Sequence, residues 1–141
     1  MIFLTVEQVI GAHDMILEAT GIGVPGVKDA NTLASGVDRA ETRAYYNESA
    51  DAASLAAAVC FGIAKAHGFN DANKRTAAFC CELFLNLNGL DLDLSDNLFE
   101  DMIVNLAAGA LNEEGFANMI RPLLRPASDD LEEVEDHAPG P

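Results

Sequence analysis

Tryptophan is absent from this sequence, and other aromatic residues are few, with two tyrosines and seven phenylalanines among 141 residues. Alanine and leucine dominate the hydrophobic half of the composition, whereas valine and isoleucine do not form the alternating runs typical of half-buried strands. Alanine and leucine favour helices. A chain of this length normally forms one domain with a substantial core. We therefore predict a single all-α domain.

Positive charge is scarce as well. Eight lysines and arginines face 23 acidic residues, which gives a formal net charge of −15. Six of the acids fall within the segment 129–136. Because a surface this negative repels phosphate backbones, general nucleic-acid binding is excluded.

Cysteine is limited to Cys60, Cys80 and Cys81, an odd number without a CxxC spacing. This usage argues against a disulfide framework or a zinc site and favours core positions in a reducing compartment. The longest uncharged apolar run, 52–64, is too short to span a bilayer. The first residues lack the basic n-region of a signal peptide. A cytoplasmic protein without a membrane partner is expected.

Caps and apolar periodicity predict about six helices. Thr5 and Gln8 form a capping-box pattern, and Gly21 is a stop signal. The expected helices cover 6–20, 29–35, 51–67, 73–87, 95–110 and 113–124, and 90–94 alternates like a short strand. Residues 37–47 show no clean helical stripe and are predicted to form a short extended flap. The helix at 73–87 is apolar on nearly every face, so we place it at the centre of the bundle.

The predicted domain covers residues 1–125, and the acidic, Pro/Gly-ended segment 126–141 is expected to be a disordered tail.

The stretch HGFNDANKRT (67–76) concentrates polar chemistry between the two most apolar predicted helices. Lys74 and Arg75 lie at a helix N-terminus, where cations oppose the helix dipole, and Lys65 lies one turn earlier. No other basic residue occurs between positions 76 and 120. Free backbone N–H groups at a helix start attract anions. A bound polyphosphate would resolve the unfavourable placement of these cations.

His67 faces that helix start from the end of the preceding helix, and Asp71 follows four residues later. Histidine can act as a general base, and a carboxylate can hold Mg²⁺ beside a nucleotide, so phosphoryl or nucleotidyl transfer is indicated. Phe69 is expected to point into the core. Simpler interpretations remain open at this stage: His67 as a helix end, Asp71 as an N-cap, and Lys74 and Arg75 as solvated charges. A Walker A loop is excluded because Asn73 and Arg75 break its pattern.

The run HGFNDANKRTA resembles the signature of the Fic/Doc family, roughly H-x-F-x-[DE]-x-N-[GK]-R. The matching positions are His67, Phe69, Asp71, Asn73 and Arg75. Lys74 and the following RTA resemble the Doc branch, whereas the Fic branch has glycine at the position of Lys74. GVPGVKD (23–29) and FLNLNG (84–89) are similar to Doc-type chains as well, so the resemblance covers about residues 3–125.

The resemblance implies a helical bundle with the motif between two central helices. It also implies a toxin of a toxin–antitoxin pair, a protein kinase that transfers the γ-phosphate of ATP to a threonine of elongation factor Tu and so blocks translation. His67 would be the general base, Asp71 both a catalytic residue on the acid side and the Mg²⁺ ligand, and Phe69 the structural anchor. Asn73, Lys74, Arg75 and Thr76 would hold the nucleotide, and Arg75 would also act in catalysis.

Departures from the family pattern bear on the reaction. Fic-type adenylyltransferases carry a second arginine where this chain has Ala78, which favours phosphate transfer over AMP transfer. The self-inhibitory pattern [ST]-x-x-x-E-[GN] is missing, so inhibition is expected from an antitoxin partner. AMP transfer and an inactive antitoxin-binding module are the alternatives.

Four further residues carry smaller expectations. Gly68, where relatives often have proline or a bulky apolar residue, predicts a looser loop. His13 matches a recurrent family histidine, and core packing or a capping contact is expected for it. Tyr45 and Tyr46 would close the core or line a substrate groove.

Overall fold

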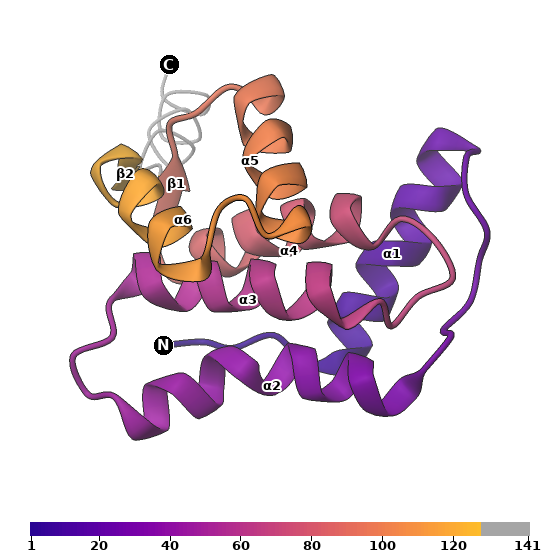
Figure 1. Ribbon diagram of the computed structural model, residues 1–141, viewed down its shortest axis with the longest axis horizontal. Coiled ribbons are helices and arrows are strands. Elements are labelled where there is room, and N and C mark those ends of the chain that lie inside the picture. The colour runs from indigo at the N-terminus through magenta and orange to yellow at the C-terminus, as the bar shows by residue number, and fades with distance from the viewer. Residues whose placement is uncertain (128–141) are drawn as a thin grey trace, which may run out of the picture.

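The computed structural model describes residues 1–127, and within them the fold is helical, as the composition predicts (Figure 1). The elements in chain order are α1 (Val6–Thr20), α2 (Ala30–Tyr46), α3 (Ala52–Ala66), α4 (Asn73–Leu87), β1 (Leu90–Leu92), α5 (Asp96–Ala108), α6 (Glu113–Ile120), the 3₁₀ turn η1 (Arg121–Leu123) and β2 (Leu124–Pro126). None of these helices is long and apolar enough to cross a membrane.

Helix starts follow the capping residues. Thr5 and Gln8 form the expected capping box at α1, and Gly21 ends that helix in the left-handed conformation. The side chains of Asp29, Asp51 and Ser95 accept N–H bonds at the starts of α2, α3 and α5. These caps satisfy donors that a helix leaves free at its first turn. The helix starts predicted from these signals are therefore confirmed.

Helix α3 runs through the middle of the bundle, with α2 on one side and α5 and α6 on the other (Figure 1). Its side chains are buried from Leu55 to Cys60 and again at Ile63 and Ala64. Helix α4 lies against it and buries Cys80, Cys81 and Phe84, yet it leaves Phe79 38 % exposed. The most completely enclosed helix is therefore α3, with α4 beside it.

The three cysteines are unpaired and fully buried, as predicted for core residues. Burial raises the pKa of the Cys80 thiol to about 12 and that of Cys60 well above its ordinary value. Thiols held in this protonated form are inert packing groups.

The predicted flap at 37–47 is wrong, because helix α2 continues through it to Tyr46. The buried stripe of α2 is Leu33, Val37 and Ala40, which is narrow and partly made of a small residue. Gly36 lies against Gly62 of α3 so closely that a Cβ on Gly36 would collide with the carbonyl oxygen of Gly62. Close backbone contact between α2 and α3 thus adds to the packing that Leu33 and Val37 provide.

Tyr45 and Tyr46 do not close the core. They are 78 % and 80 % exposed, and their rings meet edge to face with centroids 4.9 Å apart.

A two-stranded antiparallel sheet joins β1 to β2, with Leu90 opposite Pro126 and Leu92 opposite Leu124. The alternating segment at 90–94 is thus a strand in its first half. The predicted helix at 113–124 ends at Ile120 instead, because η1 and then β2 follow. Pro126 belongs to this sheet rather than to the tail, and the Ala127 N–H donates to Gly89 O at 2.7 Å. The remainder of the predicted tail, 128–141, lies outside the described residues.

Candidate active site

The motif residues occupy the turn between α3 and α4. His67 is the C-cap of α3 in the left-handed conformation (φ 50°, ψ 40°), with its side chain exposed. Phe69 is 1 % exposed and enters the core. Positive φ is tolerated by histidine better than by most residues, although it remains uncommon outside glycine. The backbone conformation of this turn therefore places Phe69 in the core and leaves His67 at the surface.

The α1–α2 loop holds this turn in place. Gly68 O accepts the N–H groups of Lys28 (2.7 Å) and Asp29 (3.1 Å), and Asn70 N–H donates to Gly26 O (3.1 Å). A Cβ on Gly68 would lie 2.7 Å from Leu33 Cβ, so this position admits no side chain. The expectation of a looser loop at Gly68 is wrong, because glycine allows close packing against Leu33 and three backbone hydrogen bonds join this turn to the α1–α2 loop.

Asn73 binds the turn from within. Its Oδ1 accepts the Phe69 N–H at 3.1 Å, and its Nδ2 donates to Phe69 O at 3.0 Å. Both ends of the amide are thus engaged with one residue of the loop. In this structure Asn73 fixes the backbone between His67 and α4.

Asp71 accepts two backbone N–H groups, from Ala72 at 2.8 Å to Oδ1 and from Val24 at 3.1 Å to Oδ2. These bonds, that of Ala72 first, lower the pKa of the Asp71 carboxyl below its ordinary value. The side chain does not cap α4, whose N-cap is Ala72 and has no side-chain cap bond. Asp71 is therefore an ionised carboxylate next to an open helix start.

A single carboxylate of this kind suits Mg²⁺, which usually combines one or two carboxylates with substrate phosphates and water. No cluster of three or more possible metal ligands occurs in residues 1–127. The donor set thus fits a metal brought in with a nucleotide rather than one held by the protein alone.

Arg75 reaches back to the end of α1, where its Nη1 lies 3.3 Å from Ile22 O and 3.4 Å from Thr20 Oγ1. A Cβ on Gly23 would lie 3.2 Å from Arg75 Nη2 and 3.4 Å from Asp71 Oδ2. Gly23, with φ +124°, therefore allows the first loop to approach both site residues. The sequence indicated only a chain break there, and nothing local to it pointed to the motif.

Lys74 is exposed and takes part in none of the ion pairs formed among the described residues. Lys65 is directed elsewhere, since its Nζ donates to Ala107 O near the end of α5. The local cationic site thus consists of Lys74 and Arg75. Thr76 is not part of it, because its side chain is fully buried and its hydroxyl donates to Ala72 O at 2.8 Å. The expected nucleotide contact of Thr76 is not supported.

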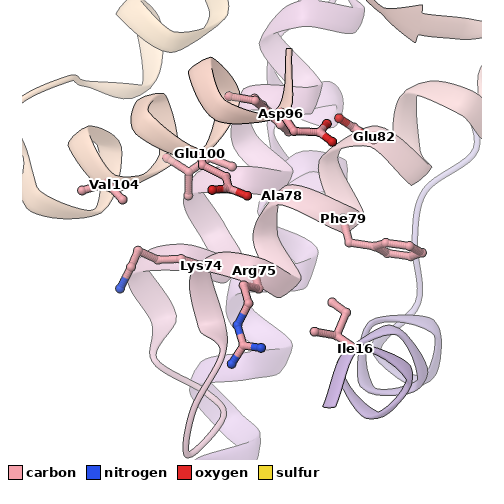
Figure 2. A pocket seen from close by; sticks show the side chains of 11 residues that line it. Ile16, Lys74, Arg75, Ala78, Phe79, Glu82, Asp96, Glu100 and Val104 are labelled. Atoms are coloured by element: carbon pink, nitrogen blue, oxygen red, sulfur yellow. The ribbon is translucent and has the colours of Figure 1, made fainter. Parts of the chain in front are cut away.

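A groove of about 440 Å³ extends from this site between α4, α5 and α1. Figure 2 shows Lys74 and Arg75 at one end and Glu82 beside Asp96 at the other, with Phe79 and Ile16 along one side. Burial, followed by the neighbouring charges of Asp96 and Asp91, raises the pKa of Glu82. The groove therefore has a cationic end and an acidic end, and the carboxylate of Glu100 lies between them beside apolar side chains.

His13 is buried in α1, in agreement with the expected core position, and it contacts the motif directly. Its Nε2 lies 2.9 Å from Asp71 O, and its ring stacks on Phe69. Sequence spacing could not have revealed this contact, because 58 positions separate His13 from Asp71.

The helical bundle and this turn define the class of the protein. The sequence profile of the Fic/DOC family matches residues 3–85, more than half of the chain and the whole of the motif, so the chain belongs to that family. Among individual proteins it is similar to the protein kinase Doc of Escherichia phage P1. The two are 34 % identical over 117 residues, which cover 83 % of this chain and 91 % of the phage protein.

Proposed function

We propose that this protein is a Doc-type toxin, a protein kinase that transfers the γ-phosphate of ATP to a threonine of elongation factor Tu and blocks translation. The observation that supports it best is the uncapped, cationic N-terminus of α4, which lies next to the ionised Asp71 on the turn that begins at His67. The 34 % identity to a protein named as a kinase supports the same reaction.

The phosphate site in this proposal is the start of α4. The first intrahelical N–H bond there is that of Thr76 to Ala72 O, and no side chain caps the turn. The N–H groups of Asn73, Lys74 and Arg75 are then available to phosphate oxygens, and two cations stand beside them. Such preorganised donors stabilise charge that develops during transfer, and one donor typically contributes about 10²–10³ in rate.

His67 would accept the proton of the threonine hydroxyl. The hydroxyl oxygen forms a bond to the γ-phosphorus, the bond to the bridging β–γ oxygen breaks, and ADP leaves. Asp71 and the nucleotide phosphates would hold Mg²⁺, which neutralises charge on the phosphates when bound. His67 is exposed at the rim of the turn, where a protein substrate can reach it.

Labelled ATP tests this reaction. Purified protein is incubated with elongation factor Tu, Mg²⁺ and ATP carrying the label on either the γ- or the α-phosphate, and the modified residue is located by mass spectrometry. Label from the γ position on a threonine is expected. Label from the α position would replace the proposal with AMP transfer.

The third outcome separates catalysis from binding. No transfer with either label, together with tight binding of an antitoxin, would identify the protein as an inactive binding module. The proposed antitoxin is a separate protein, and co-expression of the correct antitoxin should restore growth and suppress transfer. In this proposal, phosphate transfer and its inhibition by the antitoxin both take place in the cytoplasm, where elongation factor Tu works.

A further inference from the structure

His13 and Thr76 are the buried polar or charged side chains of the described chain, and the mechanism above uses neither. Thr76 is satisfied within its own helix by Ala72 O. His13 instead reaches from α1 into the motif turn. Buried polar groups require hydrogen-bond partners. The hydrogen bond of the buried His13 imidazole therefore fixes the position of the loop atom that it contacts, which apolar packing alone would not do.

Two contacts orient the ring of His13. Its plane lies 3° from that of Phe69, with centroids 3.9 Å apart, and its Nε2 lies 2.9 Å from Asp71 O. A carbonyl oxygen only accepts, so Nε2 carries the proton and donates. Nδ1 makes no hydrogen bond within residues 1–127, and Asp14 Oδ1, at 3.6 Å, is beyond hydrogen-bonding distance.

The bonded carbonyl precedes a strained position. Ala72 has φ +62° and ψ 27°, a left-handed conformation that is unfavourable for alanine. Rotation of the 71–72 peptide would relieve this strain. It would also move the Ala72 N–H, which is one of the two donors that hold the Asp71 carboxylate. The His13 bond opposes that rotation from the core side, whereas the Val24 N–H holds the carboxylate from the first loop.

We propose that His13 is a positioning residue for the transfer site. It fixes the Asp71 carbonyl and the Phe69 ring, and thereby holds the Asp71 carboxylate and the first turn of α4 in the orientation that phosphoryl transfer requires. This assignment rests on the proposed function and adds to it a residue outside the motif.

Two substitutions separate the contacts of His13. His13→Phe retains a ring that can stack on Phe69 but removes the donor. His13→Gln retains an N–H donor at nearly the same reach but removes the ring. Val9→Ala is the matched control, because Val9 is a buried α1 residue one turn before His13, and its truncation weakens packing but removes no hydrogen bond to the motif.

Kinase kinetics provide the first readout. His13→Phe should fold with a melting temperature close to that of the wild type and lose at least tenfold in kcat, with little change in KM for elongation factor Tu. His13→Gln should recover most of that loss. Val9→Ala should lower the melting temperature and leave kcat within about twofold of the wild type. Unchanged kcat in folded His13→Phe, or an equal loss in Val9→Ala, would overturn the proposal.

Nitrogen-15 NMR provides a readout that needs no activity. The wild type should show a slowly exchanging Nε2–H on His13, and His13→Phe should shift the amide signals of Asp71, Ala72 and Asn73 and speed their hydrogen exchange. An unprotonated Nε2, or unchanged signals in His13→Phe, would refute the positioning role even if the wild type proved to transfer no phosphate. Failure of wild-type transfer alone would instead refute the proposed function.

Discussion

Helices α3 and α4 lie side by side and are each fifteen residues long, yet their N-termini are built in opposite ways. At α3, Asp51 accepts the Ser54 N–H at 2.9 Å, and Arg121 Nε donates to Asp51 Oδ2 at 2.6 Å. The hydrogen bond from Arg121 is the main cause that lowers the pKa of Asp51 far below its usual range. At α4, Ala72 provides no cap, and Lys74 and Arg75 occupy the first turn.

The difference separates a helix start used for stability from one that remains available to a ligand. An acidic cap accepts the Ser54 N–H and complements the dipole at α3, so a bound anion is not needed there. The same groups at α4 stay open, and the cations beside them increase the attraction for phosphate. Changes at the α4 start should therefore affect activity, and changes at the α3 start should affect stability.

The largest expected effect is the loss of the proposed base, His67. Replacing His67 with Asn should lower kcat about 10²- to 10⁴-fold, because asparagine cannot accept the proton. Asparagine tolerates the positive φ of this position, so the melting temperature should stay close to that of the wild type. His67→Ala should give the same loss. Retained activity in either folded variant would refute the role of His67 as the general base.

A smaller effect is expected from the charge at the α4 start. Lys74→Met should raise KM for ATP about tenfold, in line with the loss of one charge-assisted hydrogen bond of about 1.5 kcal/mol. Lys65→Met is the control, since it removes the same charge from a side chain bonded to Ala107 O. Equal effects of the two substitutions on KM would mean that only overall charge matters.

The α3 start should respond in stability instead. Asp51→Ala removes both the cap and the ion pair and should lower the free energy of unfolding by about 1–2 kcal/mol. Asp51→Asn preserves the cap and removes only the charge, and should cost less than about 1 kcal/mol because the pair is largely exposed. Denaturant titrations measure both values, and kcat should remain unchanged. A loss of kcat without a loss of stability would contradict the division between the two helix starts.

The charge at Asp51 also predicts a pH dependence. The pKa of Asp51 is lower in the folded protein than in the unfolded chain, so its contribution is fully present above the unfolded value of about 3.9. It is lost as the pH falls further, toward the folded pKa. The stability difference between the wild type and Asp51→Asn should therefore be constant from pH 7 to about pH 5 and shrink below about pH 4. A difference that grows in acid would contradict this linkage.

The smallest effect should come from the strained residue of the α4 start. Ala72→Gly should stabilise the fold by relieving the strain of a left-handed conformation. It should also destabilise the fold, because a buried methyl group is lost and the unfolded chain gains entropy. These effects oppose each other, so the free energy of unfolding should change by less than about 0.5 kcal/mol. The same replacement at Ala78, inside α4, should cost about 1 kcal/mol. Comparison of the two urea midpoints checks this. Equal losses at both positions would mean that Ala72 is not strained.

Much of the helical framework was predictable because its signals are local. The caps at Thr5, Asp51 and Ser95 each bond to a residue three positions later in the chain, so the sequence displays both partners directly. The error at 37–47 arose because the buried stripe of α2 continues beyond Val37 only through the small residue Ala40, which is a weak apolar signal among polar and charged residues. The close contact of Gly36 with Gly62 of α3 leaves no side-chain signal at all. The β2 strand was missed because it forms only by pairing with Leu90–Leu92, which lie more than thirty residues earlier in the chain.

For the site, the motif residues were predictable because they are nearly contiguous, and the family match includes them. Gly23, Val24 and His13 were not predictable as neighbours of Asp71, because the loop and helix that carry them meet the motif only after folding.

The sequence by itself determined the all-helical class, the helix starts and the concentration of base, acid and cations in HGFNDANKRT. These features depend on composition and on contacts within a few residues. Only the tertiary structure decided that Thr76 faces the core, that Gly68 is pressed against Leu33, and that the first loop and His13 hold Asp71. Those contacts join segments that are far apart in the sequence, and only the packing of the folded chain determines which of these segments meet.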